Sequence, residues 1–196
     1  MERRKFIKNT TFFGSALLIG CNGNPSETES IKQNVNADTL YIPPNDKRIK
    51  LSYEQTGDQL TTVELKLPPK MCGPAPHSHD ELDEIVRVLS GTLTVMVEDS
   101  IVKIPEGGWH FRPRKKIHGF WNEEDEPVHF IEIYPNQNFD VMLQRIWDLR
   151  NRLIKSGISL DSKAAWEKVD EIQKEWGIKM YHERRKEIID KYGLRG

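Results

Sequence analysis

The chain has 196 residues, which is enough for one domain with a sizeable core and an added module but tight for two full domains. Its 29 basic and 30 acidic residues give a formal net charge of -1, so no global field would recruit nucleic acid, and we expect no nucleic-acid partner. A hydrophobic content of 37% excludes a chain that is disordered throughout.

The N-terminus has the pattern of an export signal. A charged segment that contains Arg3 and Arg4 is followed by a short apolar run and then by Cys21. The run is too short for a membrane span, which needs about 20 apolar residues. The arginine pair resembles a twin-arginine (Tat) signal, and residues 18–21 resemble a bacterial lipobox, whose cysteine is acylated. We expect removal of residues 1–20 and lipidation of Cys21, which would anchor an exported protein to the cell envelope. An N-terminal membrane helix with a chance arginine pair is the alternative.

The sequence has two cysteines, Cys21 and Cys72. If Cys21 is lipidated, no disulfide can form within the mature chain. If it is not, a disulfide between the two stays open in an oxidising compartment. We interpret Cys72 as a buried thiol, with a redox or substrate-facing role as the alternative. Residues 21–39 are polar and lack an apolar period, which predicts a flexible tether.

Residues 40–136 predict an all-β domain. Short runs of alternating or β-branched residues are separated by Pro, Gly, Asn and Asp, a pattern typical of a sandwich or barrel. The expected strands cover residues 48–53, 60–67, 84–89, 92–97, 101–104 and 128–134.

Residues 137–196 change to a helical period and predict a helical extension. Its apolar stripes indicate packing on the barrel or on a partner subunit rather than a ligand site. The expected helices cover residues 141–154, a segment from a cap at Asp161 or Ser162 to Gly177, and residues 179–192.

The segment from His77 to Glu84 predicts half of a metal site. Alternate residues of a strand point to one face, so His77 and His79 should project together, about 7 Å apart along the chain. Glu84 follows on the next expected strand after a four-residue turn. Two imidazoles and a carboxylate suit Mn, Fe, Co, Ni or Zn better than Ca²⁺ or Mg²⁺. The pattern therefore predicts a transition-metal half-site.

This segment, together with residues 107–122, resembles the cupin family. The matches to its first motif are His77, His79, Glu84 and Gly91, and those to its second are Gly107, Pro113, His118 and Asn122. Lys115 stands where the second motif usually has Gly. The resemblance implies a double-stranded β-helix or jelly-roll barrel, and it adds His118 to the three metal ligands.

A second register competes for the fourth ligand. Residues 105–110 also read Pro-x-Gly-x-x-His, which would make His110 the ligand. Arg114, however, stands where this register requires Asn, so we favour His118. Two further histidines are interpreted as ordinary surface or core residues: His129 and His182.

The resemblance also implies a function. We expect one divalent transition metal, with Ni, Co or Zn as alternatives to Mn or Fe. Mn and Fe are favoured because a Tat substrate folds before export and can be loaded away from copper and zinc.

The implied protein is a metal-dependent small-molecule enzyme, with a dioxygenase-like oxidoreductase favoured over a decarboxylase or isomerase. Glu84 is both ligand and candidate base. The alternatives are a non-catalytic sugar- or ligand-binding module and a helical tail that assembles a surface complex. Cupins commonly pair through the outer sheet, which implies a homodimer.

Two further groups lie near the candidate site. A basic turn is interpreted as a solvated loop, with attraction of an anionic small-molecule substrate as the alternative; it consists of Arg112, Arg114, Lys115 and Lys116. Four aromatic residues are expected to line or wall the barrel: Trp109, Phe111, Phe120 and Trp121.

Overall fold

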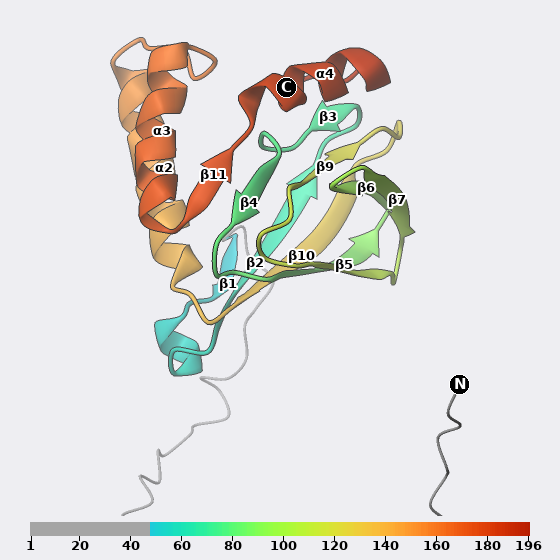
Figure 1. The fold of residues 1–196 in the computed structure, drawn as a ribbon, viewed down its shortest axis with the longest axis horizontal. Helices are drawn as coiled ribbons and strands as arrows, with labels where there is room; N and C mark the ends of the chain where they lie inside the picture. The colour runs from blue at the N-terminus through green and yellow to red at the C-terminus, as the bar shows by residue number, and fades with distance from the viewer. Residues whose placement is uncertain (1–47) are drawn as a thin grey trace, which may run out of the picture. The chain divides into compact units, whose positions relative to one another are not determined.

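The structure, a computed structural model, describes residues 48–196. The expected export signal, the tether and Cys21 lie outside these residues. The predicted succession of short strands and then helices is confirmed within them (Figure 1). None of the helices between residues 48 and 196 has both the length and the apolar character that a membrane span requires.

The strands form two sheets with antiparallel pairing between neighbours. The five-stranded sheet has the order β1 (Ile49–Leu51), β2 (Leu60–Leu67), β10 (Val128–Pro135), β5 (Glu84–Ser90) and β8 (Trp109–Arg112). The second sheet has the order β11 (Ile178–Met180), β4 (His77–His79), β9 (His118–Asn122), β6 (Thr92–Val97) and β7 (Ser100–Pro105), with β3 (Met71–Cys72) also paired to β9. A short 3-10 helix, η1 (Glu54–Thr56), joins β1 to β2.

The main core lies between the two sheets, and β5 and β10 of the first sheet alternate buried and less buried residues. Strands β6 and β9 of the second sheet are buried on both faces, because α4 covers the outer one. Val86 and Val88 of β5 pack in one cluster with Leu93 and Val95 of β6 and with Phe130 of β10. Side chains of a strand point alternately to its two faces, and the inward residues of both sheets form this apolar cluster. The inner face also carries the side chains that form the site described below.

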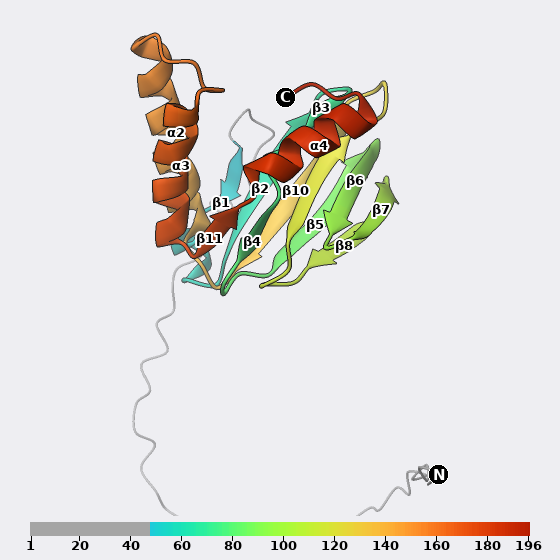
Figure 2. The ribbon, with the colours of Figure 1, turned by 45° about the horizontal axis from the view of Figure 1, so that its top comes forward.

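The α-helices of residues 48–196 are α2 (Phe139–Lys155), α3 (Lys163–Glu175) and α4 (His182–Tyr192). Ser162 is the N-cap of α3, since its Oγ accepts a hydrogen bond of 3.2 Å from the backbone N–H of Ala165. Helices α2 and α3 stand side by side next to β11, whereas α4 lies near β3 (Figures 1 and 2). Phe139 and Met142 of α2 pack in one cluster with Val63 of the barrel.

The third expected helix begins later than predicted. Residues 178–180 instead form β11, an edge strand beside β4, with Ile178 opposite His79 and Met180 opposite His77. Gly177 adopts a left-handed φ of 68° that ends the helical path, and its carbonyl accepts a hydrogen bond of 2.9 Å from the N–H of Asp80. The extension therefore contributes a strand to the sheet that carries two of the candidate ligands.

Candidate metal centre

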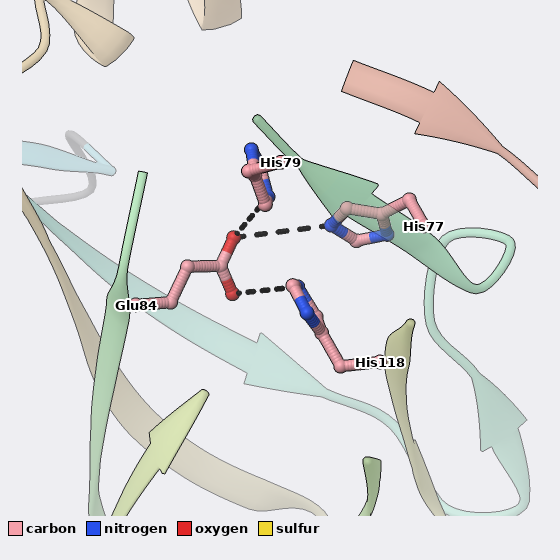
Figure 3. Close-up of side chains that lie close together, drawn as sticks. All are labelled: His77, His79, Glu84 and His118. Carbon is pink, nitrogen blue, oxygen red and sulfur yellow. Dashed lines mark ion pairs between the residues drawn. The ribbon is translucent and has the colours of Figure 1, made fainter. Parts of the chain in front are cut away.

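Four side chains from three strands converge inside the barrel (Figure 3). His77 and His79 come from β4, Glu84 from β5 and His118 from β9. One potential ligand atom of each residue lies within 4.8 Å of the others, and all four residues are buried. The structure thus brings together the four residues for which the sequence predicts metal binding.

Glu84 lies at the centre of the cluster. Its Oε1 is 2.8 Å from Nε2 of His79 and 3.8 Å from Nε2 of His77, and its Oε2 is 3.3 Å from Nε2 of His118 (Figure 3). His77 and His118 are brought together by the pairing of β4 with β9, in which they stand opposite each other. All three imidazoles therefore present Nε2 to the carboxylate.

Backbone carbonyls fix the orientation of two of the imidazoles. Nδ1 of His77 lies 2.9 Å from the carbonyl oxygen of Ala75, and Nδ1 of His118 lies 3.0 Å from that of Lys116. A carbonyl oxygen can only accept, so each Nδ1 carries the hydrogen and each Nε2 keeps a free lone pair. Metal-bound histidines are held in the same way.

The cluster contains buried polar atoms that lack a hydrogen bond. Within residues 48–196, Nε2 of His79 and of His118 are both buried without a hydrogen-bond partner. The 2.8 Å contact between His79 and Glu84 is close enough for an ion pair, but its direction does not make a hydrogen bond. Buried polar groups are nearly always satisfied, and a metal ion would satisfy both nitrogens. The donor set of three imidazoles and a carboxylate fits a divalent transition metal.

The protonation states also suit metal binding. Burial lowers the pKa of His118 to about 4, although the nearby Glu84 carboxylate opposes this shift. Burial alone would raise the pKa of Glu84, but Arg112, His118 and His79 outweigh it and hold that pKa well below its usual range. At neutral pH the site therefore offers a neutral His118 and an ionised Glu84, the forms in which these side chains bind metals.

A buried ionic chain supports Glu84 from behind. Nη1 of Arg112 lies 3.1 Å from Oε2 of Glu84, and Nη2 of Arg112 pairs with Glu132. The second carboxylate oxygen of Glu132 accepts a hydrogen bond from the hydroxyl of Tyr134. All four of these side chains are buried, and Arg112 has no exposed surface. This chain fixes the position and the charge of Glu84.

The interpretation of Arg112 as part of a solvated turn is wrong. Arg112 is the last residue of β8 and stands directly opposite Glu84 in the register of β5 and β8. The sequence did contain a sign that a cation is buried here. In β10, buried and less buried residues alternate, and the acidic Glu132 stands at one of the buried positions. A carboxylate on the inner face of a strand requires a buried cation, and Arg112 provides it.

The rest of the basic turn remains near the surface. Arg114 is 40% exposed and pairs with Asp83, with Nη2 2.8 Å from Oδ2. Lys115 has a left-handed φ of 64°, which explains why the related motif usually has Gly at this position. The backbone N–H of Lys115 donates a hydrogen bond of 2.7 Å to the carbonyl of His79. The turn therefore holds the strand that carries two of the candidate ligands, His77 and His79.

The other predicted residues lie outside the cluster. His110 is half-buried on β8, His129 lies 2.7 Å from Glu64, and His182 lies 2.8 Å from Asp170. Cys72 is buried in the cluster of Met96 and Trp121, and burial raises the pKa of its thiol although Arg185 opposes this shift. Asn122 is not part of the four-residue cluster. Its Nδ2 donates to three backbone carbonyls: those of Leu67, Pro68 and Glu126.

The aromatic residues are divided between the two faces of the barrel. Phe120 lines a cavity beside the four-residue cluster, whereas Trp121 points to the opposite face of β9 and is buried against α4. Trp109 and Phe111 are 56% and 54% exposed, so the prediction that the four aromatic residues line or wall the barrel is wrong for these two. The inward positions of β8 are taken by His110 and Arg112, which leaves the alternate residues on the outer face.

Comparison with known proteins finds a match to one family model within the barrel. The family model described as the cupin domain matches residues 63–134, a range that contains all four members of the cluster. With the arrangement of the sheets, this match confirms the predicted cupin-like fold with C-terminal helices. No curated protein matches the sequence.

Several solved structures resemble this chain. A Photorhabdus luminescens protein is 21% identical with a TM-score of 0.36, and 38% of this chain covers 61% of it. A sugar phosphate isomerase from a cupin superfamily of Silicibacter pomeroyi is 23% identical with a TM-score of 0.40, and 45% of this chain covers 59% of it. A predicted oxalate decarboxylase of Thermotoga maritima is 24% identical with a TM-score of 0.42, over 44% of this chain and 76% of that protein. The chain thus spans about three fifths of the length of the first two.

Proposed function

We propose that this chain, which carries a cupin domain, is a metal-dependent enzyme that acts on a small molecule. The convergence of three buried imidazole Nε2 atoms on the Glu84 carboxylate is the observation that supports the proposal. His77, His79, Glu84 and His118 would hold one Mn or Fe ion. Such an ion supplies a Lewis acid, and four protein ligands leave it one or two open positions for a substrate oxygen.

The chain's own residues supply the charge and the orientation. Arg112 holds Glu84 ionised and directs its carboxylate at the imidazoles, while the carbonyls of Ala75 and Lys116 set the tautomers of His77 and His118. Glu84 is also the candidate base for a substrate proton, since it lines the cavity beside the cluster. A dioxygenase-like oxidoreductase is the reaction class that we favour, ahead of a decarboxylase or an isomerase.

Elemental analysis combined with activity screening tests this proposal. Protein purified from its native membrane should contain about one Mn or Fe per chain, and Glu84→Ala should remove both the metal and metal-dependent turnover of oxygen-dependent substrates. Glu64→Ala is the control, because Glu64 pairs with His129 away from the cluster. Metal with saturable ligand binding and no turnover would favour a non-catalytic binding module instead. Absence of metal from the wild-type protein would contradict the proposal.

We also propose export and anchoring through a lipid on Cys21. The support is the arginine pair at Arg3 and Arg4 and the lipobox-like residues 18–21. Cys21→Ala should move the protein from the membrane fraction to the soluble fraction, whereas Cys72→Ala should leave it in the membrane fraction. A mature protein whose mass shows no acyl chains on Cys21 would exclude the anchor.

A homodimer is part of the same proposal. Trp109 and Phe111 are exposed on the outer face of the five-stranded sheet, beside Ile85 and Arg87 of the neighbouring strand β5. Large apolar side chains exposed on one face mark contact surfaces. Light scattering should give the mass of two chains, and a monomer would exclude this pairing.

A further inference from the structure

A cavity of about 580 Å³ joins the four-residue cluster of candidate metal ligands to the helical extension. His77 and Glu84 line it from the barrel, and residues of α2, α3, β11 and α4 line it from the extension. Its volume lies in the range of about 300–1,000 Å³ that is usual for small-molecule sites. The barrel alone does not provide this space, because the helices form much of its wall.

The wall that the helices contribute is largely apolar. It includes Ile146 and Trp147 of α2 and Trp166 and Val169 of α3. Trp166 is 38% exposed although it is a large aromatic residue. An apolar wall that is left open in this way fits the hydrocarbon or aromatic body of a ligand.

Three arginines that line the same cavity form no ion pair within the described residues: Arg48, Arg150 and Arg185, of which Arg185 donates a hydrogen bond to the carbonyl of Gly73. Arg150 follows Trp147 by three positions on α2 and so lies on the same side of the helix. The guanidinium of Arg48 lies 5.7 Å from the ring centre of Trp147. By contrast, Arg145, also on α2, pairs with Glu175.

The acidic residues that line the cavity do not balance this charge. Asp170 is 2.8 Å from His182, and Glu84 and Glu132 are both paired with Arg112. Among the lining side-chain carboxylates of the described part of the chain, that leaves Asp161 without an ion pair. The open end of the cavity is therefore suited to a negatively charged group.

We propose that this cavity binds an amphipathic organic acid as the substrate. The apolar or aromatic body would lie against Trp147 and Trp166, and the acid group would bind Arg150 with Arg48, since a guanidinium can hold a carboxylate through two parallel hydrogen bonds. This inference rests on the proposed function, because it takes the cavity as the place where the substrate reaches the metal. It assigns selection of the substrate to the helical extension.

Two probes of the same shape and different charge test the inference. 4-Phenylbutyrate and its uncharged amide are titrated calorimetrically into the full-length, metal-containing protein. The acid should bind at least about tenfold more tightly than the amide, in line with the strength of hydrogen bonds to charged groups. Arg150→Gln should remove this preference and leave amide binding unchanged, which also shows that the variant is folded. Trp166→Ala should weaken the binding of both probes.

Arg152→Gln is the matched control, because Arg152 is exposed on the same helix and does not line this cavity. Equal binding of acid and amide to the wild type, no binding of the acid at millimolar concentration, or an equal effect of Arg152→Gln and Arg150→Gln would overturn the inference. The metal content of each sample is measured in parallel. Preference for the acid in a protein without metal would support the binding site and contradict only the enzymatic function.

Discussion

Replacement of Arg112 by methionine is expected to lower the free energy of unfolding by about 3–5 kcal/mol, the usual cost of removing one partner from a buried ionic group. Arg112 has no exposed surface and contacts both Glu84 and Glu132. Its removal leaves two buried carboxylates without their cation. Methionine keeps much of the apolar part of the arginine side chain, so the loss of stability comes mainly from the missing positive charge. Urea unfolding of the metal-free protein measures it.

Arg114→Met is the matched control for this prediction. Arg114 pairs with Asp83 on the surface, where solvent screens the interaction, so a far smaller loss is expected. A second substitution, Glu132→Gln, should recover part of the stability of Arg112→Met, since it removes one of the unpaired charges. If the Arg112 and Arg114 variants lost the same small amount of stability, the buried chain would not contribute as described.

His118→Ala is expected to lower metal affinity by more than about 100-fold. Loss of an outer hydrogen-bond partner already costs about 10- to 100-fold, and His118 would contribute a direct bond. Its Nε2 is buried, lacks a hydrogen bond and lies 3.3 Å from Glu84, so alanine removes a donor that nothing nearby can replace. Competition with a metal-binding dye measures the affinity.

His110→Ala provides the comparison that decides between the two sequence registers. His110 lies on β8 and is not part of the four-residue cluster, so this variant should keep the wild-type affinity. Loss of metal from His110→Ala and retention by His118→Ala would reverse the assignment. Wild-type affinity in both variants would mean that the metal needs only His77, His79 and Glu84.

The sequence predicts most accurately where the pattern is local. Residues 60–67 and 92–97 form strands with the predicted bounds, because β-branched and apolar residues recur there between clear turns. Three of the candidate ligands, His77, His79 and Glu84, were also found from local spacing, whereas His118 came from the family resemblance. Lys115 shows the limit of motif matching, because the left-handed turn is kept although the expected glycine is absent.

Features that depend on distant segments were not predicted. β11 has three residues, too few for a periodic pattern, and it forms because β4 offers an unpaired edge. The burial of Arg112 depends on Glu132, which lies on another strand of the same sheet. The outward position of Trp109 follows from the register of β8, which apolar composition alone does not reveal.

The pairing of β11 with β4 affects the order in which the protein is made. A ribosome synthesises β4, β5 and β9 early, but the outer edge of β4 stays bare until residues 178–180 have emerged. A bare edge strand is a template for pairing with other chains. The strand that carries His77 and His79 therefore completes its hydrogen bonding only after residues 178–180 have been synthesised, and a chain interrupted after the barrel would expose this edge to aggregation and proteolysis.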